Sequence, residues 1–577
     1  MTLNDMTLND MTISLAAHRE RDRLLNTWLR EFQPDLSKAI RAGHEVEIRA
    51  GDAMIVTKCD RFSPGGFHRF GAHVTVRDRN GSRVVEDASH LAAFLLRTQR
   101  DASSEEIEDI LYRIGRSSMA SREHAVFLSV AASGVSAVAL EQSLWFGHPF
   151  HPLAKSVGGF TKTDTENYAP ERAARFQLRW LLVNRRHVRE FASDHGRLDD
   201  MDSRLLAASG LSASDMRDNV LFPCHPWQAA RLEKNPDFAD RLRSGEMRIT
   251  QATGDVAVPT SSVRTVWFPD QNLFVKLPIE ARITNFPRVN TDEQIARSVA
   301  GARAIAAVAP AAEQAGLTVL DEPIGRILQT RNADGDFRYH PETGYLLRDA
   351  HFGKGPTPLV VAGLLETNPV NGKSNLATVS GHHLQGRESA HRWLKAYIQV
   401  SLMPLLRLFN DTGIALEAHS QNSLVRFVDG WPDRLFVRDL EGIAVDRTAF
   451  ERRFNGDGAP LLDQALFYDR TTVWRRLLYY VVVNHFSHVV ATVAEVASID
   501  ERDLWSRARR VLEQFSDVAA VSELLASTDL PAKANLKSCL GGHGEAPSYI
   551  PVSNPFLTGK IATSSDIRQL NPAEATP

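Results

Sequence analysis

Cysteine, net charge and long apolar runs are all scarce in this sequence of 577 residues. Its three cysteines, Cys59, Cys224 and Cys539, lie far apart and fit neither a zinc nor a redox spacing. Reduced thiols in a cytosolic protein are therefore expected. The formal net charge of −3 argues against a dedicated nucleic-acid binder, because binding a phosphate backbone requires a basic domain.

The apolar segments do not predict a membrane span. Phe127–Leu140 is shorter than the ~20 apolar residues that cross a bilayer, and Leu477–Ala497 is interrupted by Asn484, His485 and His488. The chain begins with two copies of Met-Thr-Leu-Asn-Asp, which is too polar for the apolar region of a signal peptide. A cytoplasmic protein with no membrane partner is predicted.

The common nucleotide and hydrolase motifs are missing as well. Gly372-Lys373-Ser374 resembles the end of a phosphate-binding loop, but the required first glycine is replaced by Thr367. Neither Gly-x-Ser-x-Gly nor His-Glu-x-x-His occurs. A nucleotide, if one binds, must be held by other residues.

The pattern of apolar residues divides the chain into more than one hydrophobic core, as its length requires. Residues 12–145 combine a small strand region with helices, in one of which Leu25 and Leu29 recur at helical spacing. Residues 146–340 mix loops with hairpins: Val263–Phe268 and Leu273–Leu277 flank a turn at 269–272, and Glu293–Ala307 is predicted to be a helix. From about residue 380 onward, helices dominate around one further hairpin. Residues 1–11 are predicted to be disordered and the tail 563–577 loose. Helices and strands are segregated rather than alternating, which favours an α+β fold.

Two short segments, Leu416–Asn422 and Arg438–Gly442, are unusually polar. Turn-forming residues precede the first and separate the two, which predicts a β-hairpin. Alternate residues of a strand share one face. The polar residues expected on such faces are Glu417, His419, Gln421, Asp439 and Glu441. A solvent-facing edge would explain any one of them, but the whole set favours a polar site for a metal and a nucleotide.

Cations and hydroxyls gather between positions 259 and 288. The candidates for binding an anion are Ser262, Arg264, Thr265, Lys276, Arg282, Thr284, Asn285 and Arg288. Arginine forks match phosphate and carboxylate oxygens, and hydroxyls complete the shell. The alternative is a solvated basic face. Interleaved apolar residues such as Ile279 and Phe286 favour partial burial, where a cation needs an anion.

Two loops combine histidine with proline. In Gly147–Lys155 the prolines fix the loop shape, which would hold His151 and Lys155 toward a ligand. A structural loop with capping histidines explains the same residues. In His225–Gln228, packing around Trp227 is the favoured interpretation.

Seven motifs in one order resemble those of the NRPS-independent siderophore synthetases, the aerobactin- and achromobactin-type enzymes. They are Gly147-His-Pro-x-His-Pro-x-x-Lys155, His225-Pro-Trp-Gln228, Ser262-x-Arg-Thr265, Lys276, Arg282-x-Thr-Asn285-x-x-Arg288, Glu417-Ala-His-x-Gln-Asn422 and Arg438-Asp439. The resemblance covers about residues 140–560 and implies a cupped-hand fold of thumb (12–145), fingers (146–340) and palm (341–562) domains, usually dimeric. One departure is Ser156–Phe160, where a basic residue is expected before the glycine.

The resemblance implies a ligase that uses ATP and Mg²⁺ to adenylate a carboxylic acid, with citrate preferred, and passes the acyl group to an amine or alcohol. AMP and pyrophosphate are released. The residues that would hold ATP are His151, Ser262, Arg264, Thr265, Lys276, Gln421 and Asp439. The residues that would hold the carboxylate are Thr284, Asn285, Arg288 and His419. Those that would bind the metal are Glu417 and Asp439. The catalytic residues would be His419, Arg288, Glu417 and Lys276.

The expected mechanism follows from charge. Arg264, Lys276 and Arg288 would neutralise the acid and the α-phosphate by positioning and electrostatics, and His419 or Glu417 would accept the proton of the attacking amine. A kinase-like phosphotransferase that releases ADP remains open, as does a non-catalytic binding protein. The acid could also be a citryl or succinyl conjugate or 2-oxoglutarate, and the acceptor is not disclosed.

Overall fold

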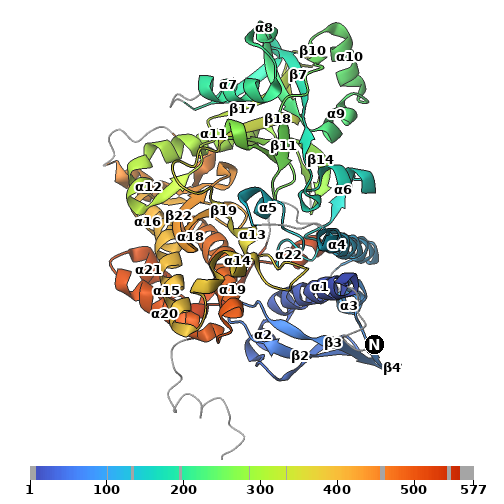
Figure 1. The fold of residues 1–577 in the computed structure, drawn as a ribbon, viewed down its shortest axis with the longest axis vertical. Helices are drawn as coiled ribbons and strands as arrows, with labels where there is room; N and C mark the ends of the chain where they lie inside the picture. The colour runs from blue at the N-terminus through green and yellow to red at the C-terminus, as the bar shows by residue number, and fades with distance from the viewer. Residues whose placement is uncertain are drawn as a thin grey trace, which may run out of the picture.

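The computed structural model describes residues 8–99, 102–130, 135–193, 198–284, 286–332, 334–454, 462–541 and 548–558. Helices and antiparallel sheets occupy separate regions (Figure 1), which confirms the predicted α+β class. Within these residues the only parallel strand pairs are β16 (Leu317–Val319) with β22 (Trp431–Val437) and β23 (Ala444–Asp446) with β24 (Phe467–Tyr468).

The N-terminal unit, blue in Figure 1, packs two long helices on a four-stranded sheet. Its elements are α1 (Leu8–Phe32), β1 (Glu45–Ala50), β2 (Ala53–Arg61), β3 (Arg69–Asp78), β4 (Gly81–Val84), α3 (Ala88–Leu96) and α4 (Ser104–Val130). Leu25 and Leu29, predicted from helical spacing, are fully buried. The predicted disorder of residues 1–11 is wrong for 8–11, which begin α1. Residues 1–7 lie outside the described part.

The middle of the chain builds a seven-stranded sheet in the order β6-β11-β12-β13-β18-β17-β8. These strands are β6 (Phe176–Gln177), β11 (Val256–Pro259), β12 (Thr265–Phe268), β13 (Leu273–Lys276), β18 (Phe337–Asp349), β17 (Ile324–Arg331) and β8 (Val188–Ala192). The predicted turn at 269–272 joins β12 to β13 and pairs Thr265 with Lys276. Helix α11 (Asp292–Ala307) covers the sheet, because its Ile295 and Val299 pack on Ile327 and Leu346.

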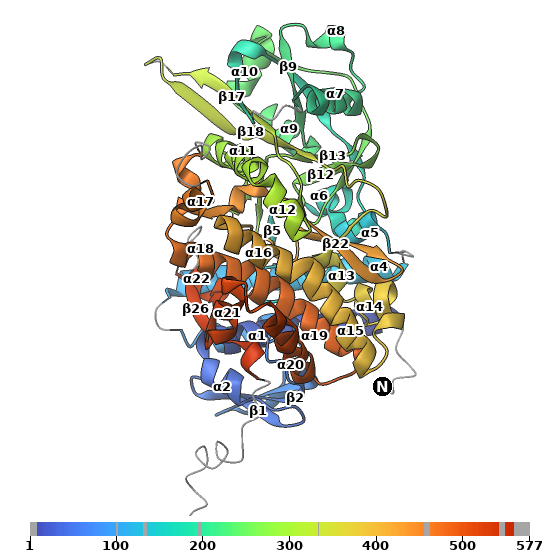
Figure 2. The same cartoon turned by 90° about the vertical axis from the view of Figure 1, so that its left-hand side faces the viewer.

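The C-terminal helices, yellow to red, form a layer that faces the viewer in Figure 2. They are α15 (Arg387–Tyr397), η6 (Ile398–Leu402), α16 (Met403–Thr412), α18 (Arg470–Leu477), η9 (Leu478–Phe486), α19 (Ser487–Ala497) and α20 (Glu501–Leu512). They share one large hydrophobic core with the neighbouring sheet. Both η6 and η9 are π-helical, a rare geometry that is often found at functional sites.

Helices α18, η9 and α19 run as one helix, Arg470–Ala497, that is long and apolar enough to cross a membrane by length and composition. Asn484, His485 and His488 interrupt this segment, which is why the sequence does not predict a span here. The structure explains the apolar composition differently, since 89% of the apolar window is buried inside the fold. The pair α11 and α12 (Ala309–Ala315) passes the same test only together, across a bend of 71°.

The thumb, fingers and palm boundaries stay a prediction. The boundary drawn between residues 340 and 341 falls within β18, which continues through it. The tail 563–577 lies outside the described residues.

Candidate functional site

A hairpin does form in the region predicted to carry the polar site, but its strands are not the polar segments. It consists of β21 (Ser423–Val428) and β22, joined by Asp429 and Gly430, both with positive φ. The predicted strands Leu416–Asn422 and Arg438–Gly442 are instead irregular segments at the open end of this hairpin, apart from a 3₁₀ turn. The prediction of two polar strand faces is therefore wrong, although the two segments do meet.

Local hydrogen bonds explain why the polar residues leave the strands. The imidazole Nδ1 of His419 accepts from the backbone N–H groups of Gln421 (3.2 Å) and Asn422 (3.3 Å), which closes a turn. After β22, Asp439 takes a left-handed conformation with φ of 73°, which ends the strand. The β21–β22 hairpin therefore brings the two polar segments together at its open end, although neither segment is part of a strand.

The first side of the site is the loop between β11 and β12. The hydroxyl of Ser262 accepts from the backbone N–H of Thr265 (3.1 Å), and Val263 adopts a φ of 66°. Arg264 is anchored by three acceptors: its Nη1 donates to the carbonyls of Arg288 and Val289 and to Oδ1 of Asn290. The predicted hydroxyl–arginine cluster is therefore a built loop with a fixed guanidinium.

Lys276, at the end of β13, joins the two sides. Its Nζ lies 2.8 Å from Asp439 Oδ1 and 2.9 Å from Glu441 Oε2, while its side chain is 2% exposed. Burial alone would lower the pKa of Lys276, but these two carboxylates raise it. Burial likewise would raise the pKa of Asp439, yet Lys276 and Arg348 hold it well below its ordinary value. Lys276, Asp439 and Glu441 are therefore all charged near neutral pH.

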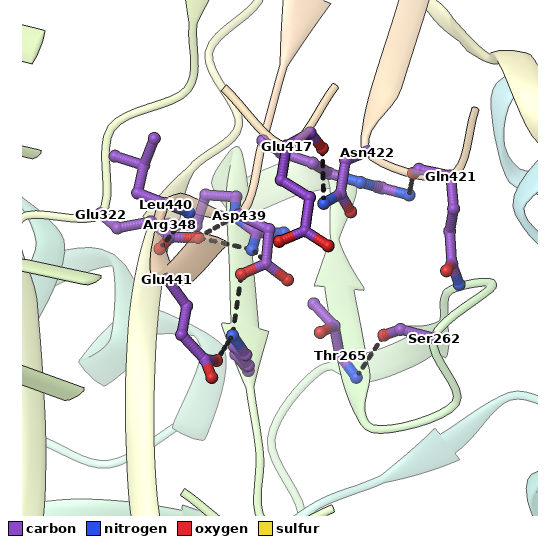
Figure 3. A network of polar contacts seen from close by, with 12 residues as sticks. Ser262, Thr265, Glu322, Arg348, Glu417, Gln421, Asn422, Asp439, Leu440 and Glu441 are labelled. Atoms are coloured by element: carbon purple, nitrogen blue, oxygen red, sulfur yellow. Dashed lines mark hydrogen bonds and ion pairs between the residues drawn. The ribbon is translucent and has the colours of Figure 1, made fainter. Parts of the chain in front are cut away.

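Two buried carboxylates that were not predicted from the sequence, Glu322 and Glu141, hold these segments in place from outside the cavity lining. Glu322 accepts from the Nε of Arg348 (2.6 Å) and from the backbone N–H of Leu440 (3.1 Å), and Arg348 lies 3.6 Å from Asp439 (Figure 3). Arginines within apolar strands were the available signal, since a buried cation requires a partner.

The second of these carboxylates is Glu141, which binds Arg438 through two hydrogen bonds of 2.6 and 3.0 Å. The same carboxylate accepts from the backbone N–H of Ser261 (3.2 Å), and Arg438 donates to the carbonyl of Gln421 (2.9 Å). One ion pair thus ties the β11–β12 loop to both segments beside the hairpin.

The residues predicted to hold a carboxylate lie beside the loop. Arg288 Nη2 donates to the hydroxyl of Thr284 (3.0 Å), and Thr284 itself has a φ of 58°. Asn285, predicted with them, lies outside the described residues. Arg282, also in this motif, pairs with Gly158 across β14 (Ile279–Ile283) and β5 (Val157–Gly158) and does not line the cavity.

The histidine loop presents a different histidine from the one predicted. His151 Nδ1 accepts from the backbone N–H of Leu153 (3.2 Å), and its ring is not part of the cavity lining. His148 lines the cavity instead, and its Nε2 lies 2.9 Å from Nδ2 of Asn484. Lys155 lines the cavity as predicted, paired with Glu171.

These residues surround a cavity of about 710 Å³. Its cationic lining residues are Lys155, Arg264, Lys276, Arg288, Arg297, Arg348, Arg438 and Arg476. The carboxylates among its lining are Glu417, Asp439 and Glu441. Cations outnumber carboxylates even when the partners Glu141, Glu171 and Glu322 are counted, so the cavity attracts polyanions.

Glu417 and His419 form a possible acid–base pair on the cavity wall. Their side chains approach to 3.9 Å between Nε2 and Oε1. Burial lowers the pKa of His419 despite the charge of Glu417, so the imidazole is neutral at pH 7. Because its Nδ1 accepts from two backbone N–H groups, the ring proton lies on Nε2, which faces Glu417, and Glu417 is the member of the pair that can accept a proton.

The residues predicted to bind a metal fit a site in which phosphates and water complete the shell, rather than a site made by protein ligands alone. Figure 3 shows the carboxylates of Glu417 and Asp439 directed into the same space. Within the described residues, no group of three or more histidine, cysteine or acidic side chains is placed to hold a metal alone. Mg²⁺ commonly takes one or two carboxylates and completes its shell with phosphates and water, which this pair permits.

The fold and the cavity define an enzyme-like site for charged small molecules. A sequence model described as the IucA / IucC family matches residues 136–366, and one described as a ferric iron reductase FhuF-like transporter matches residues 391–548. The L-2,3-diaminopropanoate–citrate ligase of Staphylococcus aureus is 31% identical over 95% of this chain and 97% of its own length. The rhizobactin biosynthesis protein RhbC of Rhizobium meliloti is 28% identical over 93% and 97%.

Among solved structures, ATP-bound aerobactin synthetase IucA from a hypervirulent Klebsiella pneumoniae pathotype matches 94% of this chain and 99% of its own, with a TM-score of 0.81 and 24% identity. At that identity the likeness concerns the fold. The chain belongs to the IucA/IucC family of NRPS-independent siderophore synthetases, which confirms the resemblance of its motifs. It is an enzyme of the ligase class.

Proposed function

We propose that this enzyme adenylates citrate with ATP and then transfers the citryl group to an amine or alcohol, giving an amide or ester, AMP and pyrophosphate. The observation that carries the proposal is the excess of cationic over acidic side chains around one cavity that also holds the Glu417–His419 pair. Bringing a tricarboxylate against a triphosphate requires this positive charge, because the two anions otherwise repel each other.

The relatives support citrate as the acid. They include ligases named for citrate with diaminopropanoate in Staphylococcus aureus and with spermidine in Bacillus anthracis, and the citryl-acetyl-hydroxylysine synthase of Escherichia coli. Their shared acid is citrate, whereas their acceptors differ. The structure of IucA with bound ATP supports the nucleotide.

The cavity residues divide into two anion subsites. Ser262 and Arg264 lie in the β11–β12 loop, and Lys276 lies at the adjacent end of β13. We assign these three residues to the phosphates of ATP together with Thr265, Gln421 and Asp439. Arg288 and Thr284, with Asn285, are assigned to the carboxylates of citrate. Glu417 and Asp439 would hold Mg²⁺, which would neutralise phosphate charge when bound.

Proton transfer is assigned to the Glu417–His419 pair. An attacking ammonium must lose a proton, and the Glu417 carboxylate, which Nε2 of His419 faces, is a suitable acceptor. The protein supplies no covalent nucleophile in this mechanism. Its contribution is to position two anions and to remove one proton.

The test separates this ligase from a kinase-like phosphotransferase. Purified enzyme with ATP, Mg²⁺ and citrate, with hydroxylamine as a surrogate nucleophile, is expected to release AMP and pyrophosphate and to form a citryl hydroxamate. Release of ADP alone would overturn the ligase mechanism. Turnover of 2-oxoglutarate or a succinyl monoamide but not of citrate would overturn only the choice of acid.

We also propose that the enzyme acts as a homodimer. Light scattering of the purified protein tests this assembly, and a mass of one chain would contradict it.

A further inference from the structure

A second cavity of about 230 Å³ adjoins the first. The residues that line both cavities are Leu144, Gly147, His148, Glu417, His419 and Gln421. The acid–base pair therefore forms part of the common wall. A group in the second cavity reaches Glu417 and His419 from the side opposite the cation-rich cavity.

The far wall of this second cavity comes from the C-terminal part of the chain. Tyr479, Tyr480 and Asn484 are supplied by η9, and Lys533 by the strand β25 (Asp529–Lys533) of a two-stranded sheet. The ring of Tyr480 lies 5.8 Å from that of His419, which connects this wall to the acid–base pair.

Lys533 is held here without a counter-charge. Its Nζ donates to the hydroxyl of Tyr480 (2.9 Å) and lies 5.2 and 4.7 Å from the ring centres of Tyr479 and Tyr480. No carboxylate makes an ion pair with it in the part of the chain that the structure describes. Burial lowers the pKa of Lys533, and Glu417, which interacts with the same Tyr480 hydroxyl, is the nearby charge that opposes this shift.

The Lys533 ammonium and the Glu417 carboxylate thus lie on either side of the Tyr480 hydroxyl, with which both side chains interact. A half-buried cation held only by a hydroxyl and two aromatic faces remains open to an anionic partner. A ligand that carries an ammonium and a carboxylate close together satisfies both groups, whereas a simple diamine leaves Lys533 facing a second cation.

We propose that this second cavity binds the acceptor substrate and that the acceptor is a primary amine bearing a carboxylate, an amino acid in chemical terms. Lys533 pairs with the carboxylate, and Glu417 with His419 receives the amine. The inference rests on the proposed ligase function. In the transfer step the amine nitrogen forms a bond to the citryl carbon, the carbon–oxygen bond to AMP breaks, and AMP leaves with that electron pair. The two protons that the bound ammonium loses on becoming the amide are released to water.

The experiment compares amines that differ only in the carboxylate. L-2,3-Diaminopropanoate is paired with ethylenediamine, and L-ornithine with 1,4-diaminobutane. For each pair, kcat/KM of the carboxylate-bearing amine is divided by kcat/KM of the plain diamine. For an acceptor that reacts slowly, its inhibition of hydroxamate formation from citrate and hydroxylamine is measured. Each ratio is taken within one protein sample, so partial misfolding of a variant cancels.

The wild-type enzyme is expected to favour the carboxylate-bearing member of at least one pair by about tenfold to a hundredfold, the range for a charge-assisted contact. Lys533→Met should remove this preference, and Lys533→Arg should retain most of it. The matched control is Lys537→Met, because Lys537 lies on the neighbouring α22 (Asn535–Leu540) over the ring of Phe32 and outside both cavities.

The results distinguish the two proposals. Absence of hydroxamate and AMP with citrate and hydroxylamine overturns the ligase function itself. If the hydroxamate forms, a wild-type enzyme that binds or uses both members of each pair equally, or prefers the plain diamines, overturns the amino-acid acceptor. A preference that persists in Lys533→Met overturns the assignment of Lys533.

Discussion

Replacing Gly442 with alanine tests the position of Glu417 without altering Glu417 itself. A methyl group at residue 442 would lie 1.8 Å from Oε2 of Glu417 and 2.7 Å from its Cβ. Rotation of the carboxylate relieves the first contact. The second involves an atom fixed to the backbone, so the segments carrying the two residues must separate.

The size of the effect follows from that displacement. Carbon atoms pack at about 3.5–4.0 Å, so the Cβ of Glu417 must shift by about 1 Å. A misplacement of about 1 Å at a catalytic group costs about a hundredfold in rate. Gly442→Ala is therefore expected to lower kcat/KM for acceptor transfer about a hundredfold. Overpacking should reduce the free energy of unfolding by only about 1–3 kcal/mol, leaving a folded enzyme.

The assay measures citrate-dependent AMP release with an acceptor amine, alongside thermal unfolding. Gly381→Ala is the matched control, because Gly381 has helical angles and a methyl group there meets nothing within 4 Å. The double variant with Glu417→Ala should be no slower than Glu417→Ala alone, since both changes act on one group. Activity of Gly442→Ala within threefold of wild type would refute the requirement for a positioned Glu417.

Three further outcomes are expected. Arg288→Ala should lower citrate-dependent AMP release at least tenfold in a protein with an unchanged circular dichroism spectrum, and near wild-type activity would contradict its role. His419→Ala should raise the KM for citrate and slow adenylation; an unchanged citrate KM would contradict that contact. Lastly, the midpoint temperature of thermal unfolding should fall as the pH is lowered from 6.5 to 4. In this range each histidine with a depressed pKa gains a proton only in the unfolded chain, which lowers the free energy of unfolding by about 1.4 kcal/mol per pH unit. Glu31 and Glu366, whose pKa burial raises to about 7, oppose this trend between pH 4.5 and 7. The histidines with a pKa of about 3 or 4 are His68, His124, His151, His225, His485 and His488. Equal midpoints at pH 7 and 4.5 would contradict this explanation.

Local pattern was sufficient for much of the fold. The apolar pattern predicted α11, which has one buried face, and the paired strands β12 and β13, which are wholly buried on either side of a clear turn signal. It misplaced the hairpin strands, since turn residues flank the polar segments as well as the true strands. Ser423–Val428 is almost wholly buried and was the better strand candidate.

The site was predicted by residue type more readily than by contact. Arg264, Lys276 and Asp439 were identified from their motifs, yet the partners that fix Arg348 and Arg438 lie far away in the sequence. Glu322 and Glu141 have no local pattern that marks them. Likewise, two histidines share the loop Gly147–Lys155, and only packing determines that His148 reaches the cavity while His151 closes a turn.

The two cavities draw their distinguishing walls from different stretches of the chain. The cation-rich wall is built mainly by the segment from β11 to β15 (Phe286–Arg288), whereas Tyr479, Tyr480 and Lys533 come from η9 and β25. Mutation of the C-terminal stretch can therefore alter the acceptor while the activating machinery stays intact. Chimeras that exchange only η9 and β25 between relatives should inherit the acceptor of the donor and the acid of the recipient.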